Sequence, residues 1–279
     1  MKFAYLSSEK ELSNPDLIEL NNFMNSSSSQ LDIIKWEDPV DFSLYHSVII
    51  GPVWDYSEKK SLFLKKCKTI SENTALINPL STIIWNSDKL YLNDLSLSGI
   101  NTISTTYIRS WHLDEVILEV KKLKFPIIMK PSIGAGGRGI VKVSSLDQVE
   151  RAFNTIPRNG SLMIQEFKPA IFDGEISAIF INGSFSHGVL KKASRNEFRV
   201  QDHYGGTYSL YPLSERELSF CHDVIESCNR EIGYARIDFM IEKSTPILVE
   251  LELIEPDLFL RLNKDSFSLM HGLFKRGLE

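Results

Sequence analysis

Three acidic side chains near the C-terminus, Asp238, Glu250 and Glu252, lie on either side of a turn that we predict near Ser244. Because strand residues alternate between faces, this hairpin places Asp238 opposite Glu250, with Glu252 on the same face. Arg236 shares that face. Carboxylates this close have raised pKa values unless a cation neutralises them, and hard oxygen ligands beside a phosphate site suit Mg²⁺. A merely solvated hairpin face is the alternative.

A glycine-rich segment, KPSIGAGGRGIVKV at residues 130–143, supplies the second chemical feature. Its glycines have the spacing of a dinucleotide-binding fingerprint, but that motif opens a helix, whereas a β-branched strand pattern follows Gly139. No Gly-Lys-Ser/Thr completes a Walker motif, and a kinase lysine would follow the loop, whereas Lys130 precedes it. We predict a strand, a phosphate-covering glycine flap and a second strand, with a plain tight hairpin as the alternative. The flap residues expected at the phosphates are Gly136, Gly137, Arg138 and Gly139.

The segment QEFKPAIFDGE follows the flap and ends a predicted strand. We expect the backbone at Glu166 and Phe167 to pair with the edge of an adenine. Asp173 or Glu175 would then accept hydrogen bonds from ribose hydroxyls.

A basic, glycine-rich segment, KKASRNEFRVQDHYGGTY, precedes the acidic hairpin. Lys191, Lys192 and Arg199 are candidates for a γ-phosphate or a substrate carboxylate, which arginine binds in a bidentate way. Gly205 and Gly206 would let backbone N–H groups approach. A solvated basic loop is the alternative.

Residues 1–85 alternate between strand and helix patterns, with one helix beginning at Asn14 and another capped by Ser57. This order predicts a small open α/β layer around a parallel sheet, in which ligands bind at the carboxyl ends of strands. The loop at residues 54–56 (Trp-Asp-Tyr) follows such a strand end. We expect it to line a substrate pocket, and a solvated turn is the alternative.

Two further helices precede the flap, the first capped by Asn86 or Ser87 and ending at Gly99. Most of the remaining chain is predicted to be β-structure. Asn182 and Gly183 stand between alternating runs, which is a strong hairpin signal.

Composition excludes several classes of protein. The 279 residues carry a net charge of −5, which argues against a general nucleic-acid or membrane-surface binder. No apolar run approaches the ~20 residues of a membrane span, and no leader pattern is visible, so we expect a cytoplasmic protein. Three cysteines without a paired motif are expected to be core thiols, and the six histidines lack zinc-site spacing.

The order of these motifs resembles the ATP-grasp superfamily: NSDK, a lysine and glycine flap, QEF, an FRVQ loop ending in a double glycine, RIDF and ELELIEP. The chain is most similar to the glutathione-synthetase-like branch, and GPVWDY, NSDK, FRVQ and ELELIEP resemble the D-cycloserine-forming (O-ureido-serine) cyclo-ligases. The resemblance implies an α/β (α+β) ATP-grasp fold. A Rossmann-like pre-ATP-grasp domain at 1–85 would precede two α+β subdomains, 86–165 and 166–279, that grip ATP.

The resemblance also implies roles for individual residues. Asp238, Glu250 and Glu252 would hold two Mg²⁺ ions, with Mn²⁺ as an alternative, although many members have Asn where this chain has Glu252. The extra charge there would shift metal affinity or choice. Residues implied at the nucleotide are Lys89, Lys130, Gly136, Gly137, Arg138, Gly139, Glu166, Phe167, Glu175 and Lys191, and the catalytic candidates are Arg199, Lys130 and Arg236.

The implied activity is ATP-dependent carboxylate–amine ligation through an acyl phosphate, on a small amino-acid-like substrate. The cyclo-ligase resemblance suggests intramolecular ring closure, and an intermolecular amide-forming ligase of the glutathione-synthetase type is the alternative. A regulatory protein that binds ATP without catalysis and a kinase with a stable phosphorylated product are further alternatives. Homodimers are common among similar ligases, so a homodimer stays open, and neither nucleic acid nor membrane is an expected partner.

Overall fold

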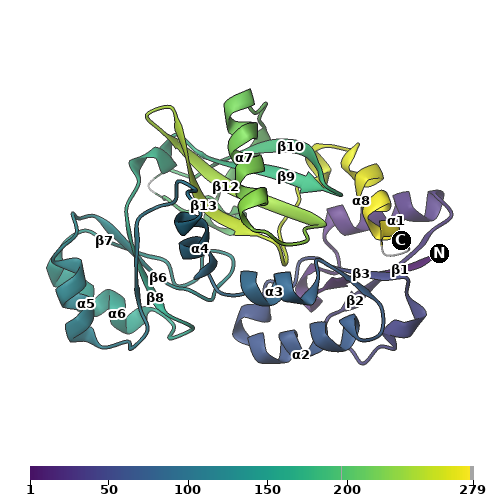
Figure 1. Cartoon of the computed structure of the whole chain (residues 1–279), viewed down its shortest axis with the longest axis horizontal. Coiled ribbons are helices and arrows are strands. Elements are labelled where there is room, and N and C mark those ends of the chain that lie inside the picture. The colour runs from purple at the N-terminus through teal and green to yellow at the C-terminus, as the bar shows by residue number, and fades with distance from the viewer. Residues whose placement is uncertain (196, 277–279) are drawn as a thin grey trace.

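The computed structural model describes residues 1–195 and 197–276, and its strands form three sheets (Figure 1). The N-terminal sheet is parallel, in the order β2-β1-β3-β4. Its strands and their flanking helices are β1 (Lys2–Ser7), α1 (Pro15–Ser26), β2 (Gln30–Lys35), β3 (Ser47–Ile50), α2 (Lys60–Ser71), β4 (Ala75–Ile77) and α3 (Leu80–Asn86).

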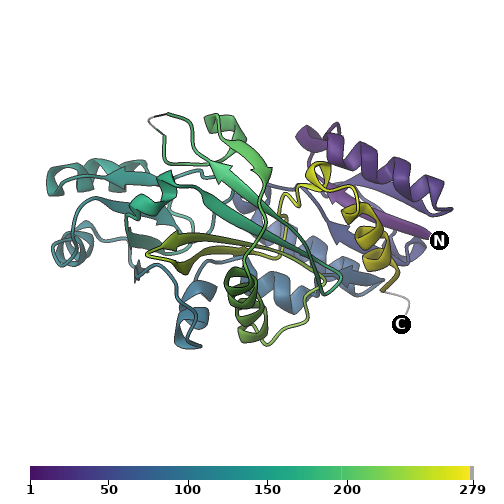
Figure 2. The ribbon, with the colours of Figure 1, turned by 90° about the horizontal axis from the view of Figure 1, so that it is seen from above.

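Alternation along β1 gives this sheet two apolar faces. Phe3 and Tyr5 pack in one core with α1, whereas Ala4 and Leu6 pack in another with α2. The C-terminal helix α8 (Ser266–Lys275) returns to the first of these faces and lies beside α1 (Figure 2). The two ends of the chain therefore build one hydrophobic core.

The second sheet is antiparallel, in the order β5-β8-β6-β7, and lies at the far end of the molecule from the N-terminal sheet (Figure 1). Its apolar side is covered by α5 and α6. The elements are β5 (Thr105–Ile108), α5 (Leu113–Val120), β6 (Ile127–Pro131), β7 (Val141–Val143), α6 (Val149–Thr155) and β8 (Leu162–Glu166).

The third sheet lies between the other two and is antiparallel, in the order β11-β10-β9-β12-β13. Helices α4 and α7 share its apolar core, which contains Cys221 and Cys228. The elements are α4 (Tyr91–Leu97), β9 (Glu175–Ile181), β10 (Ser184–Lys192), β11 (Thr207–Leu210), α7 (Glu215–Ser227), β12 (Tyr234–Glu242) and β13 (Thr245–Glu252). Among the described helices, none is both long and apolar enough to cross a membrane.

The predicted α/β fold, with a parallel N-terminal sheet, is confirmed, as are the Asn14 cap of α1, the Asn182-Gly183 turn and the buried free thiols. The proposed boundaries at 85 and 165 remain predictions. The Ser57 cap is wrong, because Ser57 lies within a short 3-10 helix and α2 begins three residues later without a side-chain cap. The single helix predicted from 86 to 99 is also wrong, since Asn86 ends α3 and α4 begins at Tyr91.

The turn of the acidic hairpin differs from the prediction in an informative way. It consists of the two residues Lys243 and Ser244, both at positive φ, so it is centred half a residue earlier than predicted. A β-bulge after Asp238 adds one residue to β13, because Phe239 pairs with Leu248 while Asp238 pairs with Glu250. The bulge restores the predicted register at the acidic residues.

Two buried asparagines join the N-terminal domain to this hairpin. The amide of Asn78 donates to the carbonyls of Tyr234 (2.9 Å) and Leu253 (2.8 Å) and accepts from the backbone N–H of Gly233. Asn86 donates to the carbonyl of Leu251 and accepts from the N–H of Leu253. Asn86 thus does not cap a helix, and its side chain instead binds backbone groups at the end of β13.

We predict that Asn78→Ala lowers the free energy of unfolding by about 3–5 kcal/mol, because several buried backbone groups lose their partner at once. Urea unfolding monitored by circular dichroism measures this. Asn73→Ala is the matched control, since its amide makes one exposed bond to the carbonyl of Thr69, and should cost less than about 1 kcal/mol. Similar losses in both variants would contradict the bridging role of Asn78.

Candidate active site

The glycine flap joins β6 to β7 as predicted and is fastened at its base by Lys89. The ammonium of Lys89 donates to the carbonyl of Gly134 at 2.7 Å, and its backbone N–H donates to the carbonyl of Ser132. Gly136 and Gly137 have positive φ, a conformation that side chains disfavour. A Cβ on Gly137 would also come within 2.9 Å of the Gln201 side chain, so the flap packs on the predicted FRVQ loop.

Arg236 neutralises two of the three predicted metal-binding carboxylates. Its guanidinium donates to both oxygens of Asp238, at 3.0–3.2 Å, and to Glu252 on the neighbouring strand. Burial raises the pKa of Asp238, but Arg236 and Lys191 outweigh it and hold that pKa at about 2. We expected closely spaced carboxylates to have raised pKa values unless a cation neutralises them, and Asp238 meets this condition because two cations and the hydroxyl of Ser177 surround it.

Lys191 links β10 to the same site. Its ammonium lies 2.5 Å from Glu175 and 3.1 Å from Asp238, and all three side chains are buried. Burial lowers the pKa of Lys191, yet the two carboxylates raise it above the ordinary value, so the lysine stays charged.

Lys89 and Lys130 bring positive charge to the flap side of the site. The ammonium of Lys89 lies 3.0 Å from Glu250, and no hydrogen bond or ion pair of Lys130 is found among the described residues. The pKa of Lys130 is lowered to about 8, chiefly by burial; the charge of Lys89 also lowers it, and the attraction of Glu250 opposes both. Lys130 is therefore a buried cation whose charge is incompletely compensated.

Acidic groups outnumber cations in this region by one, since five buried or half-buried carboxylates face four cations. Burial raises the pKa of Glu252 to about 7 in spite of Arg236, and it raises that of Glu255 well above the usual range, with Glu252 adding to the effect. The carboxylates are Glu175, Asp238, Glu250, Glu252 and Glu255, and the cations are Lys89, Lys130, Lys191 and Arg236.

The donor chemistry fits a divalent cation that arrives with phosphate oxygens. Within residues 1–195 and 197–276, no three carboxylate, imidazole or thiolate groups converge closely enough to hold a metal by themselves. The predicted ligands are instead paired with Arg236 and Lys89. Carboxylates with raised pKa values favour an added cation, and Mg²⁺ commonly takes only one or two protein carboxylates beside nucleotide phosphates and water.

The predicted adenine hinge lies at the end of β8. Glu166 is exposed and forms an ion pair with Lys168 (3.0 Å), whereas Phe167 is buried and its N–H donates to the carbonyl of Pro126. The ammonium of Lys142, on β7, lies 3.8 Å from the centre of the Phe167 ring. Phe167 also belongs to a small apolar cluster, whose other members are Ile103, Ile171, Val200, Met240 and Ile247.

Arg199 and Arg138 make their contacts outside this charge network. Two guanidinium nitrogens of Arg199 donate to the two carboxylate oxygens of Glu197, at 3.1 and 2.7 Å. The guanidinium of Arg199 also lies 3.6 Å from the centre of the Tyr204 ring. Arg199 lowers the pKa of Glu197 to about 2. Arg138 contacts the loop after β3, including the backbone carbonyl of Trp54 at 2.8 Å.

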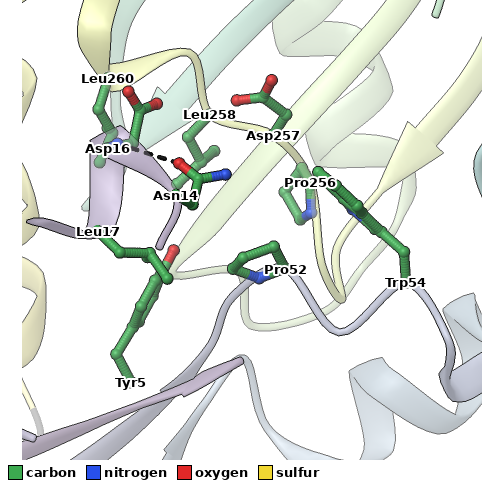
Figure 3. A pocket seen from close by; sticks show the side chains of 10 residues that line it. All are labelled: Tyr5, Asn14, Asp16, Leu17, Pro52, Trp54, Pro256, Asp257, Leu258 and Leu260. Carbon is green, nitrogen blue, oxygen red and sulfur yellow. Dashed lines mark hydrogen bonds between the residues drawn. The ribbon is translucent and has the colours of Figure 1, made fainter. Parts of the chain in front are cut away.

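A small pocket opens beside the site, where the carboxyl ends of β1 and β3 meet the segment after β13 (Figure 3). Trp54 and Pro52 face Pro256 and Asp257 across it, and the indole of Trp54 donates to the carbonyl of Glu255 at 3.0 Å. Of the predicted Trp-Asp-Tyr loop only Trp54 lines this pocket. Asp55 accepts a hydrogen bond from Trp36, and Tyr56 is buried in the core beneath α2.

Sequence analysis missed three groups of this region. Glu255 lies beyond the end of β13, so strand alternation gave no signal for it. Ser177 contacts Asp238 from β9, a strand whose pairing with β12 the sequence did not reveal. Lys142 was visible on the strand after the flap, but its closeness to the predicted hinge also depends on the pairing of β6 with β8, which the hairpin alone does not reveal.

Comparison with known proteins gives two family matches. Residues 88–258, more than half of the chain, match the model described as the ATP-grasp domain of prokaryotic glutathione synthetase. Residues 3–78 match the N-terminal domain of D-cycloserine synthetase DcsG.

Individual relatives agree with these matches. The cycloserine biosynthesis protein DcsG of Streptomyces lavendulae is 26% identical over 258 residues, which cover 84% of each chain. The crystal structure of D-cycloserine synthetase DcsG superposes with a TM-score of 0.87 at 21% identity, covering 99% of this chain and 100% of that one. D-alanine–D-alanine ligase from Bacillus anthracis complexed with ATP gives a TM-score of 0.71 at 17% identity over 100% and 97%.

We predict that Arg236→Ala destabilises the protein by about 3–5 kcal/mol, because Asp238 and Glu252 would stay buried after losing their shared cation. Arg199→Ala is the control, since its partner Glu197 lies in a partly exposed loop, and should cost about 1 kcal/mol or less. Thermal and urea unfolding measure both. An Arg236→Ala protein as stable as the Arg199→Ala protein would contradict the buried network.

Proposed function

Because the chain belongs to the ATP-grasp family of prokaryotic glutathione synthetase, we propose that it is an ATP-dependent carboxylate–amine ligase that activates its substrate as an acyl phosphate. The observation that carries the proposal is the network of buried charged side chains beside the glycine flap. Lys89 and Lys130 lie beside a cluster of five carboxylates, and this cluster contains only two further cations, Lys191 and Arg236. Nucleotide phosphates and divalent cations would balance both sets of charges.

We assign ATP to the region between the second and third sheets. Lys89, Lys130 and the flap amides would hold its phosphates, because they concentrate donors and positive charge around one loop. The adenine would pack at Phe167, whose ring belongs to the apolar cluster there. Glu175 is the candidate for ribose, although its carboxylate is also the partner of Lys191.

Divalent cations would be held by Asp238, Glu250 and Glu252, and when bound they would neutralise charge on the nucleotide phosphates. Glu252 stands where many similar ligases have Asn. Its raised pKa means that it is partly protonated at neutral pH in the absence of metal, so metal binding there would release a proton. Arg236 would keep Asp238 and Glu252 in place.

The reaction would proceed in two displacements. An oxygen of the substrate carboxylate attacks the γ-phosphorus of ATP, the bond to the β–γ bridging oxygen breaks, and ADP leaves. The nitrogen nucleophile then attacks the acyl carbon, phosphate leaves and the nitrogen loses a proton. Arg199 is our candidate for steadying the acyl phosphate. Two of its nitrogens bind Glu197 and its plane packs on Tyr204, which fixes its orientation, and its remaining terminal nitrogen would contact the phosphate.

The matches to DcsG along nearly the whole chain favour a small amino-acid-like substrate and intramolecular ring closure. An intermolecular ligase is the second candidate. It is favoured by the similarity, 32% identical over 158 residues (54% of this chain, 53% of the relative), to the coenzyme γ-F420-2:α-L-glutamate ligase of Methanococcus maripaludis.

The test is release of ADP and phosphate by purified protein with Mg²⁺ and ATP, against pools of amino acids that include O-ureido-D-serine. Stimulation by one amino acid alone supports ring closure, whereas a requirement for two supports intermolecular ligation. ADP formation without free phosphate would identify a kinase. Nucleotide binding without turnover in any pool would favour a regulatory protein.

We predict that Arg199→Ala lowers turnover by about 100-fold or more while the Kd for ATP changes less than about threefold, because an arginine that acts on the acyl phosphate contributes mainly in the transition state. Arg151→Ala, which removes an exposed arginine of α6, is the control and should leave both values unchanged. A Kd that weakens as much as turnover falls would assign Arg199 to ATP binding instead.

Nucleotide affinity should depend on the protonation of Lys130. Its pKa of about 8 lies below the ordinary value of 10.5, so the charged form that attracts phosphate is present below pH 8 and is lost above it. We expect the Kd for Mg²⁺·AMP-PCP, measured by calorimetry, to fall as pH rises through 7, where Glu252 loses its proton, and to rise by up to about tenfold per pH unit above 8, where Lys130 loses its charge. Lys130→Arg should abolish this rise, and an unchanged pH profile in that variant would refute the assignment.

A further inference from the structure

Arg138 extends from the glycine flap to the N-terminal domain. One guanidinium nitrogen donates to the carbonyl of Trp54 (2.8 Å) and to the hydroxyl of Ser57 (3.2 Å), and the other lies 3.1 Å from Glu58. The flap and these three partners lie more than 70 residues apart in the sequence. The resemblance placed Arg138 among the nucleotide ligands, whereas its side chain here reaches a different domain.

A second contact between the same two parts lies close by. The amide of Asn159, which comes from the loop before β8, donates to the carbonyl of Ser57 at 2.9 Å. Two side chains from the flap subdomain therefore bind backbone carbonyls of one short loop, residues 54–57. Backbone carbonyls keep their position when side chains move, so these bonds tie two side chains of the flap subdomain to the main chain of the loop.

The loop that Arg138 holds also borders the carboxylate hairpin and the pocket. Pro52 and Trp54 line the pocket of Figure 3, and the indole of Trp54 donates to the carbonyl of Glu255. A continuous series of contacts thus runs from the flap through Arg138 and Trp54 to the acidic segment. The side chains of this series, those of Arg138 and Trp54, are not among the groups that we assign to phosphate or metal, since only the backbone amides of the flap are assigned there.

We propose that Arg138 is a positioning residue that links the glycine flap to the pocket loop, so that nucleotide and acyl substrate bind with positive coupling. The inference rests on the proposed function, because it assumes that the flap covers ATP. When nucleotide orders the flap, Arg138 holds the pocket loop in place, and substrate in the pocket stabilises the closed flap in return. Water is therefore excluded from the activated carboxylate when both ligands are bound and the flap is closed.

The bond to the Trp54 carbonyl carries most of this effect. Side chains of Arg138 and Glu58 are 47% and 65% exposed, so their ion pair contributes little. Ser57 is buried, and the planar fork of arginine lets one nitrogen bind its hydroxyl and the Trp54 carbonyl while the other nitrogen reaches Glu58. Lysine offers no such fork and would restore the link only in part.

Hydrogen exchange with and without Mg²⁺·AMP-PCP tests the proposal before the substrate is known. In the wild-type protein we expect nucleotide to slow exchange both in the flap (residues 132–140) and in the pocket loop (residues 52–58). In Arg138→Ala the flap should still be protected, protection of the pocket loop should be lost, and the Kd for the nucleotide should change less than about threefold. Arg151→Ala is the control and should behave as wild type.

Two results would overturn the link. The first is protection of the pocket loop by nucleotide in Arg138→Ala as strong as in wild type. The second is a Kd weakened about 30-fold or more, which would assign Arg138 to phosphate. Failure of the proposed function appears separately, as a wild-type flap that nucleotide does not protect. In that case the contact between Arg138 and the pocket loop can still be tested without nucleotide. The contact predicts that the pocket loop exchanges faster in Arg138→Ala than in wild type, and equal rates would refute the contact.

Discussion

The guanidinium of Arg236, held between Asp238 and Glu252, is the interaction on which the candidate site depends. Two adjacent strands each bring a carboxylate into the protein interior, where an unpaired charge is strongly unfavourable. Arg236 makes their burial tolerable, and the raised pKa values of Glu252 and Glu255 keep the net charge of the cluster small. A site that must receive both phosphates and metal ions needs this near balance, because a large excess of either sign would disfavour one of the two.

The remaining architecture supports that arrangement from three sides. β9 and β10 contribute Ser177, Glu175 and Lys191, and the flap subdomain contributes the lysines beside Glu250. The N-terminal domain binds the hairpin backbone through the amides of Asn78 and Asn86. Packing alone would allow these parts to slide, whereas hydrogen bonds to backbone groups fix their relative position at individual residues.

Local patterns predicted much of this structure, and long-range contacts account for the rest. Asn14 with Pro15, the Asn182-Gly183 turn and the strand character after Gly139 are local signals, and each was confirmed. The acidic residues pair as predicted, but the actual register results from a two-residue turn together with a bulge that no local signal revealed. Asn86 was misassigned as a helix cap because asparagine is a preferred N-cap residue. The groups that its side chain actually binds lie 165 and 167 residues away in the sequence. Likewise, the contacts of Arg138 follow from how the domains meet, which spacing along the chain does not encode.

The position of helix α8 has a consequence for how the chain is made. One face of the first sheet is completed by a helix that is synthesised after all the strands described above, and the hydroxyl of Ser47 donates to the carbonyl of Phe274. Phe3 and Tyr5 are therefore not fully covered until α8 has been made, and their exposed surface is available to chaperones in that interval. Completing the first domain thus requires contacts between segments far apart in the sequence, which form slowly.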